Sequence, residues 1–324
     1  EKGRGAQYNP KNRFLKGEYI QEHPEAIDDW EQEKRDTEYI IDNSKTLVNT
    51  VTSPDVGMLY SANPYQGCEH GCIYCYARRH NPDSFSTIKV STNVDSILEK
   101  IKKHSSKLGI KVPDQVDSKY WVYEISMNSD FSNDSKFIDW VKILDFFVEN
   151  GIKSTFATKN WNKDFLNYSF KENHRIRYSV MPDNISKILE PKTLSIAKRI
   201  ECANKLFEKK ADIQFNFSPV VTYKNWKEDY ANLFRLIKQN SSEDLLKNTA
   251  CEVIFLTQNL NLHKWNISNN IDDSFIWLPD KIEEKKSQYG GTNYRYKWNL
   301  KARWIEEFKV ILKQELNIPI RYIF

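Results

Sequence analysis

Hydrophobic and polar positions alternate along this chain in two rhythms, which replace one another repeatedly between residues 56 and 260. Short runs rich in β-branched and aromatic residues are typical of strands in a sheet that is covered on its faces. Longer runs with apolar residues three or four positions apart are typical of amphipathic helices. The short runs predict strands over residues 56–64, 119–127, 152–159, 175–181, 212–221 and 250–257.

The stretches between these strands predict helices. Asn93 is a suitable N-cap for the first of them, and Gly109 and Gly151 are suitable ends for the first two. Six βα units in a row, with connections long enough for parallel crossovers, predict an α/β fold. The number of units favours a partial parallel (β/α)6 barrel over a full barrel of eight strands. The predicted helices cover residues 93–109, 135–151, 163–172, 193–210 and 226–239.

The domain organisation follows from where this alternation begins and ends. Residues 1–55 show neither rhythm, and we expect an N-terminal extension there. The barrel is expected over residues 56–260. Residues 261–324 are expected to form a C-terminal α/β segment that contacts the substrate. In a parallel barrel, ligands bind at the carboxyl ends of the strands.

Composition places the chain among ordinary globular proteins, with 40% hydrophobic residues, 28% charged residues and a formal net charge of +4. No apolar run has the length of a membrane span, and the start lacks the apolar stretch of a signal peptide. We therefore expect a cytoplasmic protein without a membrane partner. The stretch from Lys281 to Phe324 is basic, with ten Lys or Arg against five Asp or Glu. It is either a solvated surface or a surface for a polyanion.

Three of the five cysteines, Cys68, Cys72 and Cys75, lie within eight residues. Crowded thiols in a chain with an odd number of cysteines indicate metal binding in a reducing compartment. The spacing Cys-x3-Cys-x2-Cys supplies three of the four thiolates that normally bind a [4Fe-4S] cluster, so one iron stays open to a small molecule. A structural zinc ion is the alternative. Its fourth ligand would be His70, Cys202 or Cys251.

The segment CEHGCIYCY, from Cys68 to Tyr76, resembles the signature of the radical S-adenosylmethionine enzymes, Cys-x3-Cys-x-aromatic-Cys. The resemblance implies that Cys68, Cys72 and Cys75 bind a [4Fe-4S] cluster whose fourth iron is chelated by S-adenosylmethionine. Tyr74 is then expected near the adenine. Enzymes of this type use one electron from the cluster to form a 5′-deoxyadenosyl radical. A reductant such as flavodoxin or ferredoxin is the expected partner.

From Asn63 to the C-terminus the sequence is similar to the spore photoproduct lyase branch of these enzymes. The resemblance implies that Ser129, Lys159 and Ser179 hold S-adenosylmethionine, and that Glu124 and Asp130 could reach its amine. The segments that carry the similarity read YEISMNSD, FATKN, HRIRYSVMPDNISKILEPKT, RIECANKLF, NFSPVVTYKNW and GGTNYRYK.

The same resemblance implies a nucleic-acid substrate, such as DNA with a thymine lesion. Arg295 and Tyr296 match a pair that contacts the lesion and its phosphates, and Tyr76 matches a tyrosine beside the active site. Basic and aromatic side chains suit a groove that neutralises phosphates and stacks bases. The expected nucleic-acid contacts are Arg295, Tyr296, Lys297, Lys301 and Arg303.

Two positions depart from that branch, and the lesser one is Met181, which stands where the branch's Ser-x-Asn segment has Asn. The branch's hydrogen-donor cysteine falls at Met127, whose thioether has no comparable hydrogen to transfer. Tyr76, Tyr296 or re-formed S-adenosylmethionine would then be the donor. Two other hypotheses remain open: a radical enzyme for a peptide, a tRNA base or a small metabolite, and a zinc-stabilised nucleic-acid-binding module without activity.

Overall fold

The computed structural model describes residues 38–42, 48–50, 60–75, 77, 87–91, 94–105, 122–134, 138–286 and 292–324. Tyr76 and most of the predicted N-terminal extension lie outside these residues. Within the described part of the chain, no helix is long and apolar enough to cross a membrane.

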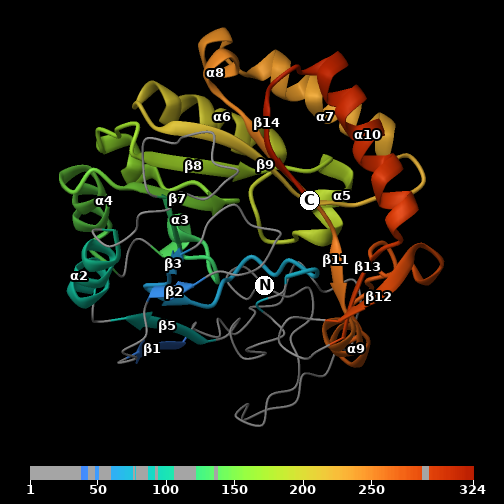
Figure 1. Cartoon of the computed structure of the whole chain (residues 1–324), viewed down its shortest axis with the longest axis horizontal. Helices are drawn as coiled ribbons and strands as arrows, with labels where there is room; N and C mark the ends of the chain where they lie inside the picture. Colours follow the sequence, from blue (N-terminus) through green and yellow to red (C-terminus); the bar gives the residue numbers. More distant parts are fainter. Residues whose placement is uncertain are drawn as a thin grey trace, which may run out of the picture.

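A curled sheet of eight strands forms the centre of the molecule (Figure 1). Its order is β14-β10-β9-β8-β7-β6-β3-β2, and every neighbouring pair from β3 to β14 is parallel, whereas β2 is antiparallel to β3. The six predicted strands and the α/β partial-barrel fold are confirmed, and β14 adds a seventh parallel strand. The strands are β2 (Val48–Thr50), β3 (Tyr60–Ala62), β6 (Val122–Ile125), β7 (Lys153–Thr158), β8 (His174–Ser179), β9 (Asp212–Val220), β10 (Cys251–Phe255) and β14 (Ile320–Ile323).

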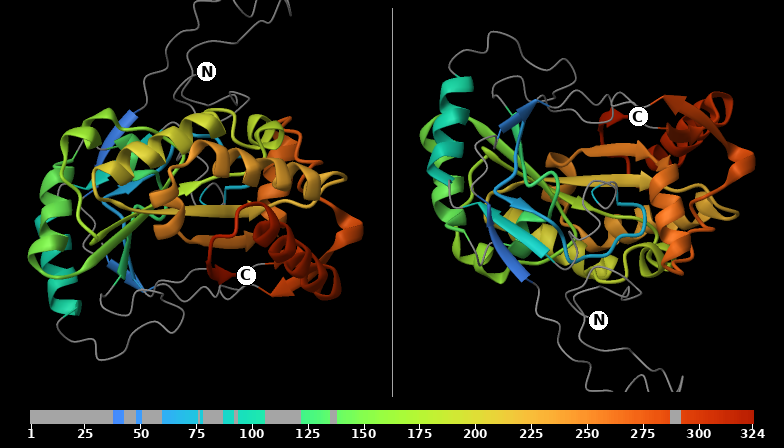
Figure 2. Two further views of the ribbon diagram at one scale, coloured as in Figure 1. Left: turned by 90° about the horizontal axis from the view of Figure 1, so that it is seen from above. Right: turned by 90° about the horizontal axis from the view of Figure 1, so that it is seen from below.

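Helices lie along the outer side of this sheet (Figure 2). Local sequence determines their ends, because the side chains of Asp139 and Ser195 accept from first-turn amides, and Gly151, with φ of 63°, follows α4. The helices are α2 (Val94–Ser105), α3 (Phe131–Asp134), α4 (Trp140–Glu149), α5 (Asp183–Leu189), α6 (Ile196–Glu208), α7 (Trp226–Asn240), α8 (Glu243–Asn248), α9 (Leu260–Ser268) and α10 (Trp298–Glu315).

The helix predicted over residues 163–172 is wrong in type and length. The structure has a short 3-10 helix, η3 (Lys163–Asn167), followed by extended chain. Tyr168 and Phe170 pack edge-to-face on each other and on His174 at the start of β8. This aromatic packing holds the chain in a path that a continuous helix would not allow.

Two small sheets flank the barrel. One has the order β1-β5-β4, with β1 (Glu38–Asp42), β5 (Thr87–Ser91) and β4 (Tyr65–Gln66). β1 and β2 lie in the region for which the sequence predicted no regular elements. The other sheet has the order β11-β13-β12, with β11 (Thr257–Asn259), β13 (Thr292–Tyr296) and β12 (Ile282–Lys286).

The two faces of the main sheet differ in polarity. Tyr123, Ile176 and Phe215 belong to the hydrophobic core beneath the helices. Their strand neighbours point to the opposite, inner face, because side chains alternate along a strand. That inner face is polar and buried, and it includes Glu124, Arg175, Arg177, Gln214, Asn216 and Glu252. A polar interior of this kind suits a barrel that receives a charged ligand.

Candidate active site

The cysteine loop follows β3 at the carboxyl end of the barrel strands. Gly67 and Gly71 have φ of 106° and 71°, values that favour glycine and let the chain turn tightly on both sides of Cys68. Cys72 is buried, Cys68 and Cys75 are half-buried, and the Cys75 amide donates to the Cys72 carbonyl at 3.1 Å. The three predicted cluster ligands therefore lie on one short, folded loop.

Backbone hydrogen bonds fix this loop against distant parts of the chain. The Ile73 amide donates to the carbonyl of Leu189, at the end of α5, at 3.0 Å. The amide of Lys192 donates to the His70 carbonyl at 3.3 Å, and Asn266 Nδ2, on α9, donates to the Ile73 carbonyl at 3.1 Å. The loop is thus held by both the barrel and the C-terminal segment.

A buried hydrogen-bond network joins the loop to the ends of two strands. His70 Nε2 lies 2.7 Å from Asp130 Oδ2, and Asp130 also accepts from the Thr158 hydroxyl at 2.8 Å and the Lys159 amide at 2.9 Å. Burial alone would raise the pKa of Asp130, but the hydrogen bonds from His70 and the neighbouring donors lower it. Asp130 is therefore an ionised anchor for the loop, and its contact with S-adenosylmethionine remains a prediction.

The zinc alternative has little support in the described residues. Within these ranges, no three His, Cys, Asp or Glu side chains converge as a single metal ion requires. Cys202 and Cys251 are fully buried on α6 and β10, and His70 is engaged by Asp130. A [4Fe-4S] cluster binds each thiolate at a separate iron, so it needs no such convergence, and the donor set of the loop fits it.

Beside the loop lies a charged cluster built around Glu190, just after α5. Glu190 accepts from the Tyr74 hydroxyl and pairs with Arg199 at 2.7 Å. Lys159 Nζ lies 3.9 Å from Glu190 Oε1 and 5.9 Å from the centre of the Tyr74 ring. Burial would raise the pKa of Glu190, but Arg199 and Lys159 lower it, so the carboxylate stays ionised. It holds Tyr74 and Lys159 next to the cysteine loop.

Sequence reasoning gave no role to Glu190. The only signal was its place in the Glu-Pro-x-Thr segment of the family resemblance. Its partners come from an aromatic in the cysteine loop, a strand end and α6, which are brought together only in the folded chain.

Ser129, Lys159 and Ser179 lie at the ends of three neighbouring strands, β6, β7 and β8, as predicted. Ser129 Oγ is buried and has no hydrogen-bond partner among the described residues. Since a buried hydroxyl without a partner is costly, this orphan atom fits a site that a polar ligand completes. Ser179 Oγ accepts from Asn216 Nδ2 at 3.3 Å.

Glu124 lies deeper in the barrel, on the inner face of β6. It accepts from Arg177, which also pairs with Glu252 at 2.8 Å. Burial raises the pKa of Glu124 to about 7, although Arg177 opposes the shift. The contact of Glu124 with S-adenosylmethionine remains a prediction. For this contact, the Glu124 carboxylate would have to leave Arg177 or bind Arg177 and the amine together.

The structure places Tyr296 in the interior of the C-terminal segment. Its side chain is only 1% exposed, its hydroxyl accepts from the Thr222 amide at 3.3 Å, and its ring meets Trp304 edge-on at 5.0 Å. Burial raises its pKa. The neighbouring Arg295 is half-buried and bonds Glu283 at 2.9 Å. Their roles as hydrogen donor and lesion contact remain predictions.

The other predicted nucleic-acid contacts lie at the start of α10. The side chains of Lys297 and Arg303 are exposed. Arg303 Nε lies 3.8 Å from Glu307 Oε1. Lys301 is buried, and its Nζ lies 3.9 Å from the centre of the Phe324 ring. The segment therefore presents some of its cations to solvent and uses another to pack the chain end.

Comparison with known proteins agrees with this geometry. A curated spore photoproduct lyase of Bacillus subtilis is 26% identical over 191 residues, which cover 58% of this chain and 53% of that protein. One of Clostridium acetobutylicum is 28% identical over 172 residues, covering 52% and 48%. The chain thus matches about half the length of these relatives.

Solved structures show the same fold. A spore photoproduct lyase complexed with dinucleoside spore photoproduct has a TM-score of 0.76 at 19% identity, over 88% of this chain and 82% of that one. A variant with bound AdoMet and dinucleoside spore photoproduct has a TM-score of 0.75 at 18% identity, over the same shares. The family model described as spore photoproduct lyase matches residues 28–322. This chain therefore belongs to the spore photoproduct lyase family.

Proposed function

We propose that this protein is a radical S-adenosylmethionine enzyme that repairs a thymine photoproduct in DNA. Cys68, Cys72 and Cys75 would bind a [4Fe-4S] cluster. When bound, the cluster and S-adenosylmethionine would supply a 5′-deoxyadenosyl radical. The observation that carries the proposal is the anchoring of the cysteine loop at the carboxyl ends of the strands by the His70–Asp130 pair.

The residues around the loop supply what such a reaction needs from the protein. Lys159 offers an ammonium for the carboxylate of S-adenosylmethionine, and Glu190 holds that ammonium in place. The Ser129 hydroxyl, which has no partner within the described residues, offers a hydrogen bond to its amine, and Ser179 offers one to its ribose. The packed strands below exclude water, which a reactive radical requires.

Two lines of support favour a DNA lesion as the substrate. The relatives carry the name spore photoproduct lyase, and family structures are described with dinucleoside spore photoproduct. The chain itself exposes Lys297, just before α10, and Arg303 on α10, and exposed cations of this kind can bind phosphates. A damaged base also leaves the stack at lower cost than an intact one, so it can reach a recessed site.

Anaerobic incubation of reconstituted protein with dithionite and S-adenosylmethionine tests the chemistry. Release of 5′-deoxyadenosine is expected, and deuterium should move between labelled photoproduct and 5′-deoxyadenosine. Cofactor cleavage without either photoproduct turnover or this transfer would mean that the enzyme acts on another substrate. Absence of both cleavage and iron binding would reject the radical reaction itself.

The half-buried Met127 gives this experiment a second arm. If the chain lacks a thiol donor at this place, wild-type protein should leave a long-lived product radical and form side products. Met127→Cys should then raise the share of clean thymine product, because it adds a transferable hydrogen. If wild type repairs the photoproduct without side products and Met127→Cys gives the same products, another group donates the hydrogen. Tyr296→Phe would then test Tyr296 as that donor.

A further inference from the structure

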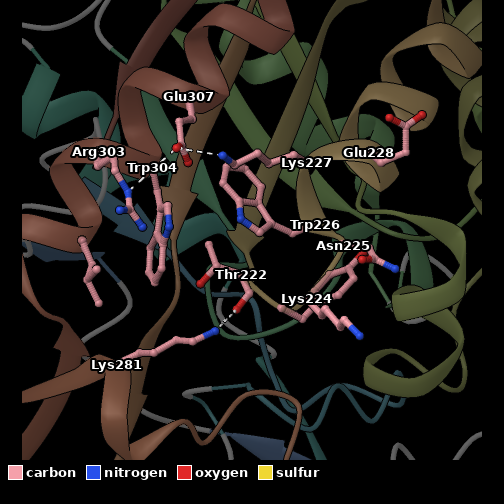
Figure 3. A pocket seen from close by; sticks show the side chains of 12 residues that line it. Thr222, Lys224, Asn225, Trp226, Lys227, Glu228, Lys281, Arg303, Trp304 and Glu307 are labelled. Atoms are coloured by element: carbon pink, nitrogen blue, oxygen red, sulfur yellow. Dashed lines mark hydrogen bonds and ion pairs between the residues drawn. The ribbon is translucent and has the colours of Figure 1, made fainter.

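A pocket of about 590 Å³ opens between the loop after β9, the short helix η4 (Pro279–Lys281) and α10 (Figure 3). None of the residues assigned above to the cluster or to S-adenosylmethionine lines it. Four of its lining side chains are basic, two are carboxylates, and Trp226, Trp304 and Tyr223 provide aromatic surface. The volume and the mixture of charge and aromatic surface suit a ligand of nucleotide size.

One side of the pocket is rich in hydrogen-bond donors. Lys281 Nζ donates to the Thr222 carbonyl at 3.5 Å and lies 5.9 Å from the centre of the Trp304 ring (Figure 3). Across the described ranges, no carboxylate lies within ion-pair distance of Lys281 or of Lys224, which also lines the pocket. Their charges are therefore available to an anion.

Thr222 gives an independent sign of a missing ligand on the same side. Its side chain is 1% exposed, and its Oγ1 makes no well-aligned hydrogen bond among the described residues, with the Tyr296 hydroxyl as its polar neighbour. The first turn of the fifteen-residue helix α7 follows directly, and the side chain of its N-cap, Asn225, makes no capping bond. An anion at this point would meet the hydroxyl, the helix N-terminus and Lys281 together.

The opposite wall has different chemistry. Glu307 Oε1 lies 2.8 Å from Lys227 Nζ and 3.8 Å from Arg303 Nε, while Glu307 Oε2 is buried without a partner in the described chain (Figure 3). This carboxylate repels a phosphate but accepts from a sugar hydroxyl or a base amino group. The pocket therefore has one end for an anion and another for a hydrogen-bond donor.

We propose that this pocket binds one nucleotide of the substrate strand outside the lesion, with its phosphate on Lys281 and Thr222 and its sugar and base along Trp304 towards Glu307. The proposal rests on the proposed function and adds a subsite to it. It predicts that the enzyme favours a lesion within a strand over the isolated dinucleoside, because only the strand fills the pocket.

The test compares a photoproduct-containing oligonucleotide with the dinucleoside photoproduct in Lys281→Gln and Thr222→Val. With the oligonucleotide, KM should rise about tenfold in Lys281→Gln, as expected for loss of a charge-assisted hydrogen bond, and kcat should change little. With the dinucleoside, KM should stay within about twofold of wild type. The salt dependence of oligonucleotide binding should fall by about one unit of slope.

Lys247→Gln is the matched control, since Lys247 is an exposed lysine on α8 that pairs with Glu243 on the same helix. It should leave both substrates and the salt slope unchanged. Two results would overturn the subsite. One is an equal rise of KM for the oligonucleotide and the dinucleoside, and the other is an unchanged KM for both substrates in Lys281→Gln and in Thr222→Val. Wild-type protein that binds the oligonucleotide with the expected salt slope, but turns over neither substrate, would reject the proposed function and leave the subsite standing.

Discussion

At the residue scale, the five cysteines fall into two groups with different surroundings. Cys68, Cys72 and Cys75 share one loop, whereas Cys202 and Cys251 are fully buried in the hydrophobic core. Burial raises the pKa of the Cys202 thiol to about 12 and that of the Cys72 thiol to about 12 as well, so the thiol pKa does not distinguish the two groups. Their place in the fold distinguishes them: Cys202 lies on α6 and Cys251 on β10, and we expect the three loop cysteines to bind a common cluster.

Cys72→Ala should abolish stable cluster binding, because two thiolates do not hold the cube. Iron and sulfide analysis after anaerobic reconstitution should give about four irons per chain for wild type and almost none for this variant. Cys202→Ala is the control: it should lose some stability through its core cavity but keep the iron. Equal iron loss in both variants would contradict the ligand assignment.

Lys159 carries the charge that we predict to bind the carboxylate of S-adenosylmethionine. Lys159→Met keeps the aliphatic stem beside Tyr74 but removes the ammonium near Glu190. Affinity for S-adenosylmethionine should fall about tenfold, as for a lost charged hydrogen bond, with iron content unchanged. Equilibrium dialysis measures this, and Lys198→Met, an exposed lysine on α6 paired with Glu201, should bind normally. Normal binding by Lys159→Met would remove Lys159 from the site.

At the scale of elements, the inner face of the sheet depends on charges shared between strands. Arg177 on β8 bonds Glu124 on β6 and Glu252 on β10, and all three side chains are buried. The two ion pairs of Arg177 cross β7 and β9, which lie between these strands. They therefore connect the five adjacent strands from β6 to β10. Such a network needs every partner, since an unpaired buried charge is costly.

Arg177→Met should therefore destabilise the protein by about 3–5 kcal/mol, because it takes the cation from buried Glu124 and leaves buried Glu252 with Arg321 alone. Arg235→Met is the comparison, since it removes a pair with Glu315 on the surface. That loss should stay within about 1 kcal/mol. Urea unfolding followed by circular dichroism measures both, and similar losses would show that the inner network carries no special share of stability.

The elements also show what the sequence reveals and what it does not. β8 was predicted within two residues at each end, because its alternating large side chains are typical of a strand. β14 was not predicted, because four residues carry little pattern and its partner β10 is far away in the chain. The cysteine motif is local and visible, whereas the His70–Asp130 and Glu190–Tyr74 contacts exist only after the strands assemble.

At the scale of the whole molecule, the C-terminal segment supplies an edge strand of the barrel sheet. β14 is the last strand of the main sheet, and α10 packs on α7. Three backbone hydrogen bonds of 2.8 Å join β10 to the chain end. The Cys251 amide donates to the Pro319 carbonyl, the Phe255 amide to the Phe324 carbonyl, and the Phe324 amide to the Val253 carbonyl. The boundary predicted at residue 260 remains a prediction, but contacts across it are extensive, and we expect both parts to unfold together.

Deletion of residues 317–324 tests this expectation. It removes β14, exposes the edge of β10 and takes Arg321 from Glu252, which lie 3.4 Å apart. With about 1 kcal/mol for each lost hydrogen bond, and more for the buried charge, stability should fall by more than about 3 kcal/mol. Circular dichroism and tryptophan fluorescence should report one shared transition at a lower midpoint, while Arg321→Gln alone should shift it less. The opposite result would be a barrel transition that keeps its wild-type midpoint after the deletion, while a second transition seen in wild type disappears. That result would mean that the C-terminal segment folds as a separate unit.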